Sequence, residues 1–100
     1  MTLSLTDLAN SSLYLDSIIE KQIILDGKSI DIIEGVTTSF NMHKINFSYD
    51  IINNKVSMSY FDGKNKKEVS LVETRVNSVD DFEKALIKAD NKLYTYFAKN

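Results

Sequence analysis

The sequence predicts an α+β fold: an antiparallel sheet of about four to five strands with an N-terminal and a C-terminal helix packed on one of its faces. Apolar and polar residues alternate through most of residues 43–60, as in half-buried strands, and an Asp-Gly pair at 26–27 separates two isoleucine-rich runs. Apolar residues recur at steps of three and four through residues 79–97, as on one face of a helix. A length of 100 residues fits one core, so residues 1–100 are expected to form a single domain.

The first helix is predicted from a capping box. Ser4 and Asp7 are spaced so that the Ser4 hydroxyl can accept from an early helical amide while the Asp7 carboxylate reaches back to the cap. A helix is therefore expected to begin here and to bury one apolar face against the sheet. The residues that can share that face at helical spacing are Leu8, Leu15, Ile18, Ile19 and Ile23.

A first hairpin is expected directly after this helix. Residues 23–25 and 30–33 have the composition of strands, and Asp26-Gly27 between them supplies the two positive φ angles of a type I′ turn. Gly35 and the mostly polar residues 37–41 follow without a periodic pattern, so they are expected to form a connection.

The second hairpin carries the strongest pattern in the chain. Alternation on both sides of Asn53-Asn54 predicts two strands joined by a two-residue loop, with apolar side chains on one face and mostly polar ones on the other. A turn at 62–65 then leads into a third strand at 68–76, whose Val69 and Leu71 fall on the apolar face. The predicted cross-strand pairs are Ile51–Val56, Tyr49–Met58 and Phe47–Tyr60 on the apolar face, and Asp50–Ser57 and Ser48–Ser59 on the other.

The C-terminal helix is the element expected to cover this apolar face. Ser78 and Asp81 repeat the capping-box spacing at its start. Its apolar stripe is formed by Val79, Phe82, Leu86, Ala89, Leu93 and Phe97.

One motif and one histidine suggest known kinds of site, but the neighbouring residues that those sites require are missing. Gly27-Lys28-Ser29 has the end of a phosphate-binding loop, but that loop needs a glycine where Gln22 stands and a helix where a strand is expected. His43 is the only histidine, it shares the alternation of Phe47, and no motif pairs it with a nucleophile. We therefore expect His43 to be a partly buried structural residue.

The acidic residues do not predict a metal site or a catalytic pair. Asp16 and Glu20 are typical of a solvated helix face, whereas Asp80, Asp81 and Glu83 suit the positive end of a helix dipole. The chain has no cysteine, which excludes thiolate ligands and cysteine nucleophiles. We expect no catalytic residues, no metal and no cofactor, and thus a protein that is not an enzyme.

A basic hairpin tip is the candidate for contact with nucleic acid. Lys64, Lys66 and Lys67 lie at one turn, and Lys55 lies in the neighbouring turn region. Lysines of this kind can neutralise phosphates. A net charge of -2 is nevertheless a weak electrostatic footprint, and the sheet aromatics are expected on the buried face. A solvated tip is the favoured interpretation, and phosphate binding is the second choice.

Four apolar residues are expected on the sheet face opposite the core. A contiguous apolar set on a sheet surface marks a contact site. We therefore expect binding of a protein partner or of a second copy of the chain there, through side chains or by addition of a strand to an exposed edge. The competing explanation is that the first helix or the N-terminal hairpin covers that side. The four residues are Ile52, Phe61, Val72 and Val76.

The segment Met1 to Leu15 lacks the pattern of a secretory signal, and no run approaches the roughly 20 apolar residues that span a bilayer. We therefore expect a cytoplasmic protein with no membrane partner. Hydrophobic residues make up 43% and charged residues 26%, which is ordinary globular usage.

These observations favour a small non-catalytic protein-binding domain. Lysine supplies 11 of the 12 basic residues beside many Ile and Asn, which is typical of AT-rich coding. Together with the small size, this suggests an inhibitor, immunity or anti-defence (anti-CRISPR-like) protein of a phage or mobile element, by association alone. The alternatives are a nucleic-acid-binding accessory protein that uses the basic tip and a homo-oligomeric structural component, for instance of a virion.

Overall fold

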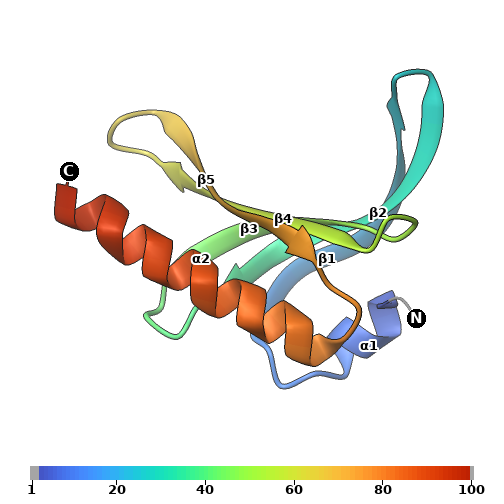
Figure 1. The fold of residues 1–100 in the computed structure, drawn as a ribbon, viewed down its shortest axis with the longest axis horizontal. Helices are drawn as coiled ribbons and strands as arrows, with labels where there is room; N and C mark the ends of the chain where they lie inside the picture. The colour runs from blue at the N-terminus through green and yellow to red at the C-terminus, as the bar shows by residue number, and fades with distance from the viewer. Residues whose placement is uncertain (1–2, 100) are drawn as a thin grey trace.

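The chain is a five-stranded antiparallel meander with both helices on one face, as a computed structural model shows for residues 3–99 (Figure 1). The strands lie in the sheet in the order of the chain, and α2 runs across the sheet (Figure 1). The predicted α+β class is confirmed. The elements are α1 (Leu5–Ala9), β1 (Leu15–Leu25), β2 (Lys28–Thr38), β3 (Lys44–Asp50), β4 (Lys55–Asp62), β5 (Lys67–Arg75) and α2 (Val79–Lys99).

One face of the sheet and the apolar stripe of α2 form the core. Phe47 of β3 meets Phe82 of α2 edge to face, with 5.1 Å between ring centroids. Burying one such ring stabilises the fold by roughly 1.5–3 kcal/mol, so the stripe holds α2 on the sheet. Phe97, at the end of the predicted stripe, stays partly exposed. The apolar residues that α2 buries are Phe82, Ala85, Leu86, Ala89 and Leu93.

The hairpin of β3 and β4 has the predicted faces but not the predicted register. Its loop is residues 51–54 instead of Asn53-Asn54 alone, because the Asp50 carboxylate accepts from the amides of Ile52 and Asn53 and closes a wider turn. Each residue is therefore paired two positions from its expected partner. A shift of two leaves every side chain on its predicted face. The observed pairs include Tyr49–Val56, Phe47–Met58 and Ser48–Ser57.

α1 begins at the predicted capping box but is much shorter than expected. The Ser4 hydroxyl accepts from the Asp7 amide and the Asp7 carboxylate accepts from the Ser4 amide, both at 3.1 Å. The helix ends at Ala9, and residues 15–25 form β1. The prediction that one helical face continues to Ile23 is therefore wrong.

A β-bulge explains the misleading apolar spacing in β1. The pairing with β2 is irregular between Asp16 and Ile19, where Ser17 has a φ of 54°. The extra residue offsets the alternation, so apolar residues on its two sides fall at steps of three and four, as they would in a helix. β2 in turn runs through residues 35–38, contrary to the prediction of a connection there.

The predicted Asp26-Gly27 turn is confirmed. Asp26 and Gly27 have φ angles of 52° and 76°, and Leu25 lies directly opposite Lys28. These are the positive angles that a type I′ turn requires. β1 and β2 are therefore joined by the tightest connection a hairpin allows.

A second bulge, in β5, decides which valines are exposed. The register with β4 shifts by one residue next to Met58, at Leu71. Leu71 is buried, and Val72 pairs with Met58 and packs against the core. Val76 is fully buried, and its carbonyl accepts from the Tyr49 hydroxyl at 2.8 Å. The prediction that Val72 and Val76 lie on the outer face is wrong, because the bulge reverses the alternation along β5.

Two hairpins extend beyond the short central strand β3. β3 pairs with β2 only from Ile32 to Thr38, and with β4 only over residues 55–59. The ends of the longer hairpins therefore lack a third strand. We call residues 22–31 the β1–β2 arm and residues 60–69 the β4–β5 arm. Both arms curve away from the helices (Figure 1).

Gly35 lies where the bulged part of β1 passes β2. A Cβ added to Gly35 would lie 3.1 Å from the Ile18 Cα and 3.2 Å from the Asp16 carbonyl oxygen. These are backbone atoms, which cannot rotate away as a side chain can. The absence of a side chain at Gly35 therefore allows the bulge to form.

We expect Gly35→Ala to lower the free energy of unfolding by about 1–3 kcal/mol, because the backbone of β1 must shift to admit the methyl group. Urea unfolding of the two proteins measures the difference. Gly63→Ala is the matched control, since the nearest atom to its added Cβ is 4.0 Å away. Equal unfolding midpoints for the two variants would contradict the proposed crowding.

Candidate docking surface on the open face of the sheet

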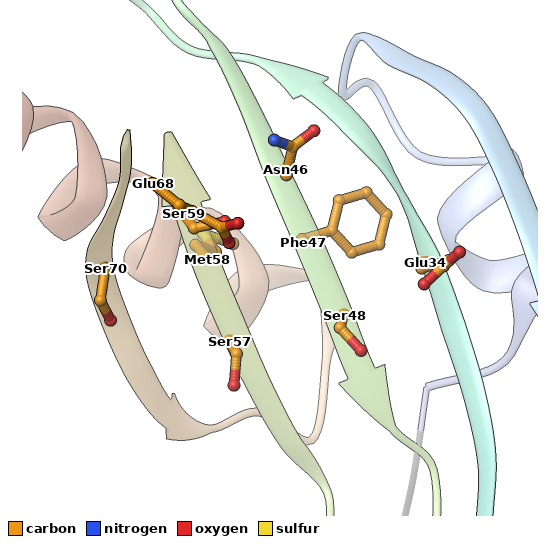
Figure 2. Close-up of a pocket in the computed structure, with 9 residues that line it drawn as sticks. All are labelled: Glu34, Asn46, Phe47, Ser48, Ser57, Met58, Ser59, Glu68 and Ser70. Carbon is orange, nitrogen blue, oxygen red and sulfur yellow. The ribbon is translucent and has the colours of Figure 1, made fainter. Parts of the chain in front are cut away.

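The sheet face opposite the helices, which we call the open face, has a floor of small polar side chains. Phe47 and Met58 point into the core, so pleating directs their neighbours in the chain to the other side. Because these neighbours are short, they leave the floor low. The floor residues are Asn46 and Ser48 from β3, Ser57 and Ser59 from β4, and Ser70 from β5 (Figure 2).

The open face is hollowed between the two arms. A depression of about 510 Å³ lies over the floor, with Glu34 on its β2 side and Glu68 on its β5 side (Figure 2). A second depression, of about 390 Å³, shares both glutamates and extends to Ser17 of β1. Together they form one groove that crosses all five strands.

The groove is lined by polar side chains and by parts of Phe47 and Met58, and it is weakly acidic. Its lining residues include two carboxylates and no Lys, Arg or His. Glu34 is paired with Lys21, with 2.6 Å between Oε1 and Nζ. Glu68 forms no ion pair with any residue of the described chain, 3–99. The carboxylate of Glu68 is thus the one available to a positive group entering the groove.

An apolar corner adjoins the groove. Phe61 on the β4–β5 arm is 55% exposed and lines a depression of about 480 Å³ with Val36, Met42 and His43. Met42 is also largely exposed. Aromatic and methionine side chains beside a polar rim are typical of protein interfaces.

The four residues predicted to form one contact surface do not lie together. Ile52, 65% exposed, is in the loop before β4, and Phe61 is near the other end of that strand. Val76 belongs to the core, and Val72 packs against it. Partner contact through Ile52 and Phe61 stays a prediction. The predicted contiguous surface does not exist, and the neighbours of Phe61 are instead Val36 and Met42.

The four predicted phosphate contacts are also divided. Lys55 begins β4 and pairs with Glu73 at 3.3 Å, whereas Lys64, Lys66 and Lys67 lie at its far end. Seven residues of strand separate the two places by roughly 20 Å. Lys55 therefore does not join the tip, because consecutive turns of a meander lie at opposite ends of a strand.

His43 lies at the end of the buried face, as predicted. Its ring is 5.1 Å from the Phe97 ring and 6.4 Å from the Tyr60 ring, centroid to centroid. Its Nδ1 faces Oδ1 of the buried Asp90 at 3.6 Å. The Ser39 hydroxyl accepts from the backbone amide of His43. These contacts connect the β2–β3 turn to α2. They fit the structural role predicted for His43.

The β4–β5 arm is attached to α2 through Asp62. Its carboxylate accepts from the amides of Lys64 and Asn65, from the Asn65 side chain at 2.8 Å and from the Tyr96 hydroxyl at 2.5 Å. These donors, Tyr96 foremost, lower the pKa of Asp62 from 3.8 to about 2. The same hydrogen bond raises the pKa of Tyr96. This side of the groove is thereby fixed in place.

The β4–β5 arm also carries one cation against an aromatic ring. Lys67 Nζ lies 5.5 Å from the centroid of Tyr96. This cation–π contact orients Lys67 toward α2.

The serines of the groove were visible in the sequence only as the polar residues that alternate with apolar ones.

Within residues 3–99, no group of three or more His, Cys, Asp or Glu is placed to hold a metal ion. No helix in this described part has the length and apolar character needed to cross a membrane. No protein-family model, curated protein or solved structure matches the chain. Function must therefore be argued from the groove and its surroundings.

The depressed pKa of Asp62 predicts how stability responds to acid. A carboxyl that titrates at about 2 when folded and near 3.8 when unfolded contributes stability above pH 4 that is lost as the pH falls toward 2. We expect the wild type to lose more stability than Asp62→Asn between pH 5 and pH 2.5 in urea unfolding. Equal losses in the two proteins would show that Asp62 is not held ionised by the fold.

Proposed function

We propose that this chain is a non-catalytic protein-binding domain that receives its partner in the groove of the open face. The observation that carries the proposal is the groove of the open face. Neither α1 nor α2 covers that face of the sheet (Figure 1). A hollow of this kind can receive an extended or protruding segment of another protein.

The chemistry of the groove indicates the kind of partner. Serine and asparagine side chains can both donate and accept, so the floor suits a polar protein surface or an extended segment. Glu68 provides a carboxylate for a lysine or arginine of the partner, and Phe61 and Met42 provide an apolar contact at the rim. The proposed partner is therefore a polar protein surface with one basic side chain and one apolar anchor.

The alternatives have less support from this geometry. A phosphate backbone in the groove would meet Glu34 and Glu68 and no basic lining residue. Nucleic-acid binding through the predicted hairpin tip would use Lys64, Lys66 and Lys67 without Lys55, and it stays a prediction, as does a structural role in a homo-oligomer. The finer proposal is a cytoplasmic inhibitor, immunity or anti-defence protein of a phage or mobile element, which rests on small size and sequence composition.

A groove variant tests the proposal. We expect tagged wild-type protein to retain a specific protein from the source cell, which is then identified, purified and titrated. Ser57→Arg fills the groove with a long charged side chain, so it should weaken this interaction at least about tenfold. Glu68→Lys should weaken it similarly, because it places like charges together.

Asn91→Arg on the exposed side of α2 is the matched control, because it introduces the same side chain away from the groove. It should bind within about twofold of wild type. Circular dichroism shows whether each variant is folded. A partner that binds Ser57→Arg as tightly as the wild type contradicts the proposal, as does the absence of any retained protein.

A further inference from the structure

The outer half of β1 is an unprotected sheet edge. In residues 19–25, Ile24 is 80% exposed, Leu25 55% and Ile19 48%. β1 is the first strand of the sheet order, so one side of its backbone has no neighbouring strand in the described chain. Exposed, regular and apolar edges are the ones that pair with further strands.

The other edge of the sheet differs from this one. β5 carries Lys67, Glu68, Glu73 and Arg75, and the bulge at Leu71 interrupts its regular backbone. Charges and bulges are the features that protect sheet edges from pairing. The bulge of β1 lies before Ile19, which leaves the segment beyond it regular.

The turn determines which backbone groups of β1 are free. In a two-residue hairpin the residues that flank the turn, here Leu25 and Lys28, form a hydrogen-bonded pair. Since bonding alternates along a strand, the N–H and C=O groups of Glu20, Gln22 and Ile24 point away from β2. A hydrogen bond from the Thr38 amide to the Tyr14 carbonyl, on the far side of the bulge, agrees with this alternation.

Few antiparallel registers between two copies of this edge are possible. A residue whose backbone N–H and C=O groups point away from β2 must lie opposite another such residue in the second copy. Even-numbered residues of one copy therefore pair only with even-numbered residues of the other. Each register has a central residue that lies opposite the same residue of the second copy. With Glu20 or Lys21 at the centre, like charges would lie opposite each other, and with Ile23 at the centre Glu20 would lie opposite Asp26. A centre at Gln22 pairs residues 19–25 completely without opposing like charges.

We propose that two copies of the chain pair antiparallel along β1 with Gln22 opposite Gln22 of the second copy. Glu20 then faces Ile24 of the second copy, Ile19 faces its Leu25, and Lys21 faces its Ile23. The three outward residues of each strand exchange about six backbone hydrogen bonds in all. This surface lies on the edge of the sheet and not on its open face, so the inference does not depend on the proposed function.

Sedimentation of the purified chain from micromolar to millimolar concentration tests the pairing. We expect a concentration-dependent change from monomer to dimer. Gln22→Pro removes an outward amide, which leaves the pairing with β2 intact, and Ile24→Glu places a carboxylate opposite Glu20 of the second copy. Each should raise the dimer dissociation constant at least about tenfold. If Gln22→Pro does not fold, Ile24→Glu supplies the test.

Ile87→Glu on α2 is the matched control, because Ile87 is also an exposed isoleucine, and it should leave the constant unchanged. A monomer at every concentration overturns the proposal and leaves only a different protein as a partner for this edge. A dimer that Ile24→Glu does not weaken also overturns it, since another surface must then hold the copies together.

Single cysteines test the register, since the chain contains none. Directly opposed residues in a hydrogen-bonded pair are about 5.5 Å apart at Cα, within reach of a disulfide. With oxidised glutathione as the oxidant, Gln22→Cys should form a covalent dimer, and Glu20→Cys should not. A mixture of Glu20→Cys and Ile24→Cys should form the mixed dimer. The reverse pattern would overturn the proposed centre.

Discussion

The division of the sheet into two unlike faces is the constraint on which the rest of the structure depends. Phe47 and Met58 enter the core, so pleating places Ser48 and Ser57 on the other side. A slip of one residue would expose the aromatic ring and bury hydroxyl groups among apolar neighbours, at a cost of about 1–3 kcal/mol for each unpaired hydroxyl. α2 has one apolar stripe, so it can cover one face only, and the open face is the consequence.

The arms follow from the same sheet and from the lengths of its strands. β3 has 7 residues, whereas β1 and β2 have 11 each, so the outer hairpins continue where the centre has ended. Strand twist then curves these two-stranded ends, which hollows the face between them. One arm is attached to α2 through Asp62 and Tyr96, and the other ends in exposed isoleucine and leucine. The groove and the β1 edge are therefore separate surfaces, and a partner in the groove leaves the edge available.

Features that depend on neighbouring residues in the chain could be predicted from the sequence. The cap hydroxyls of Ser4 and Ser78 and the turn at Asp26-Gly27 act within four residues, and the faces of β3 and β4 follow from alternation alone. The bulges could not be predicted, because they depend on contacts across the sheet such as the one that Gly35 allows. The wide β3–β4 loop is also local, but it was not predicted, because the sequence pattern did not show that the Asp50 carboxylate accepts from the amides of Ile52 and Asn53. The polar side of the groove was thus predictable, whereas its hollow, which needs the arms, was not.

Thiol labelling of two neighbouring positions tests the two-faced sheet most directly. Ser57 is exposed on the open face and Met58 is buried under α2, and the natural chain has no cysteine to interfere. In folded protein, the thiol of Ser57→Cys should react nearly as fast as a free thiol, and that of Met58→Cys should react at least about 100-fold more slowly, because it must wait for the core to open. Similar rates at the two positions, with both variants folded, would contradict the account.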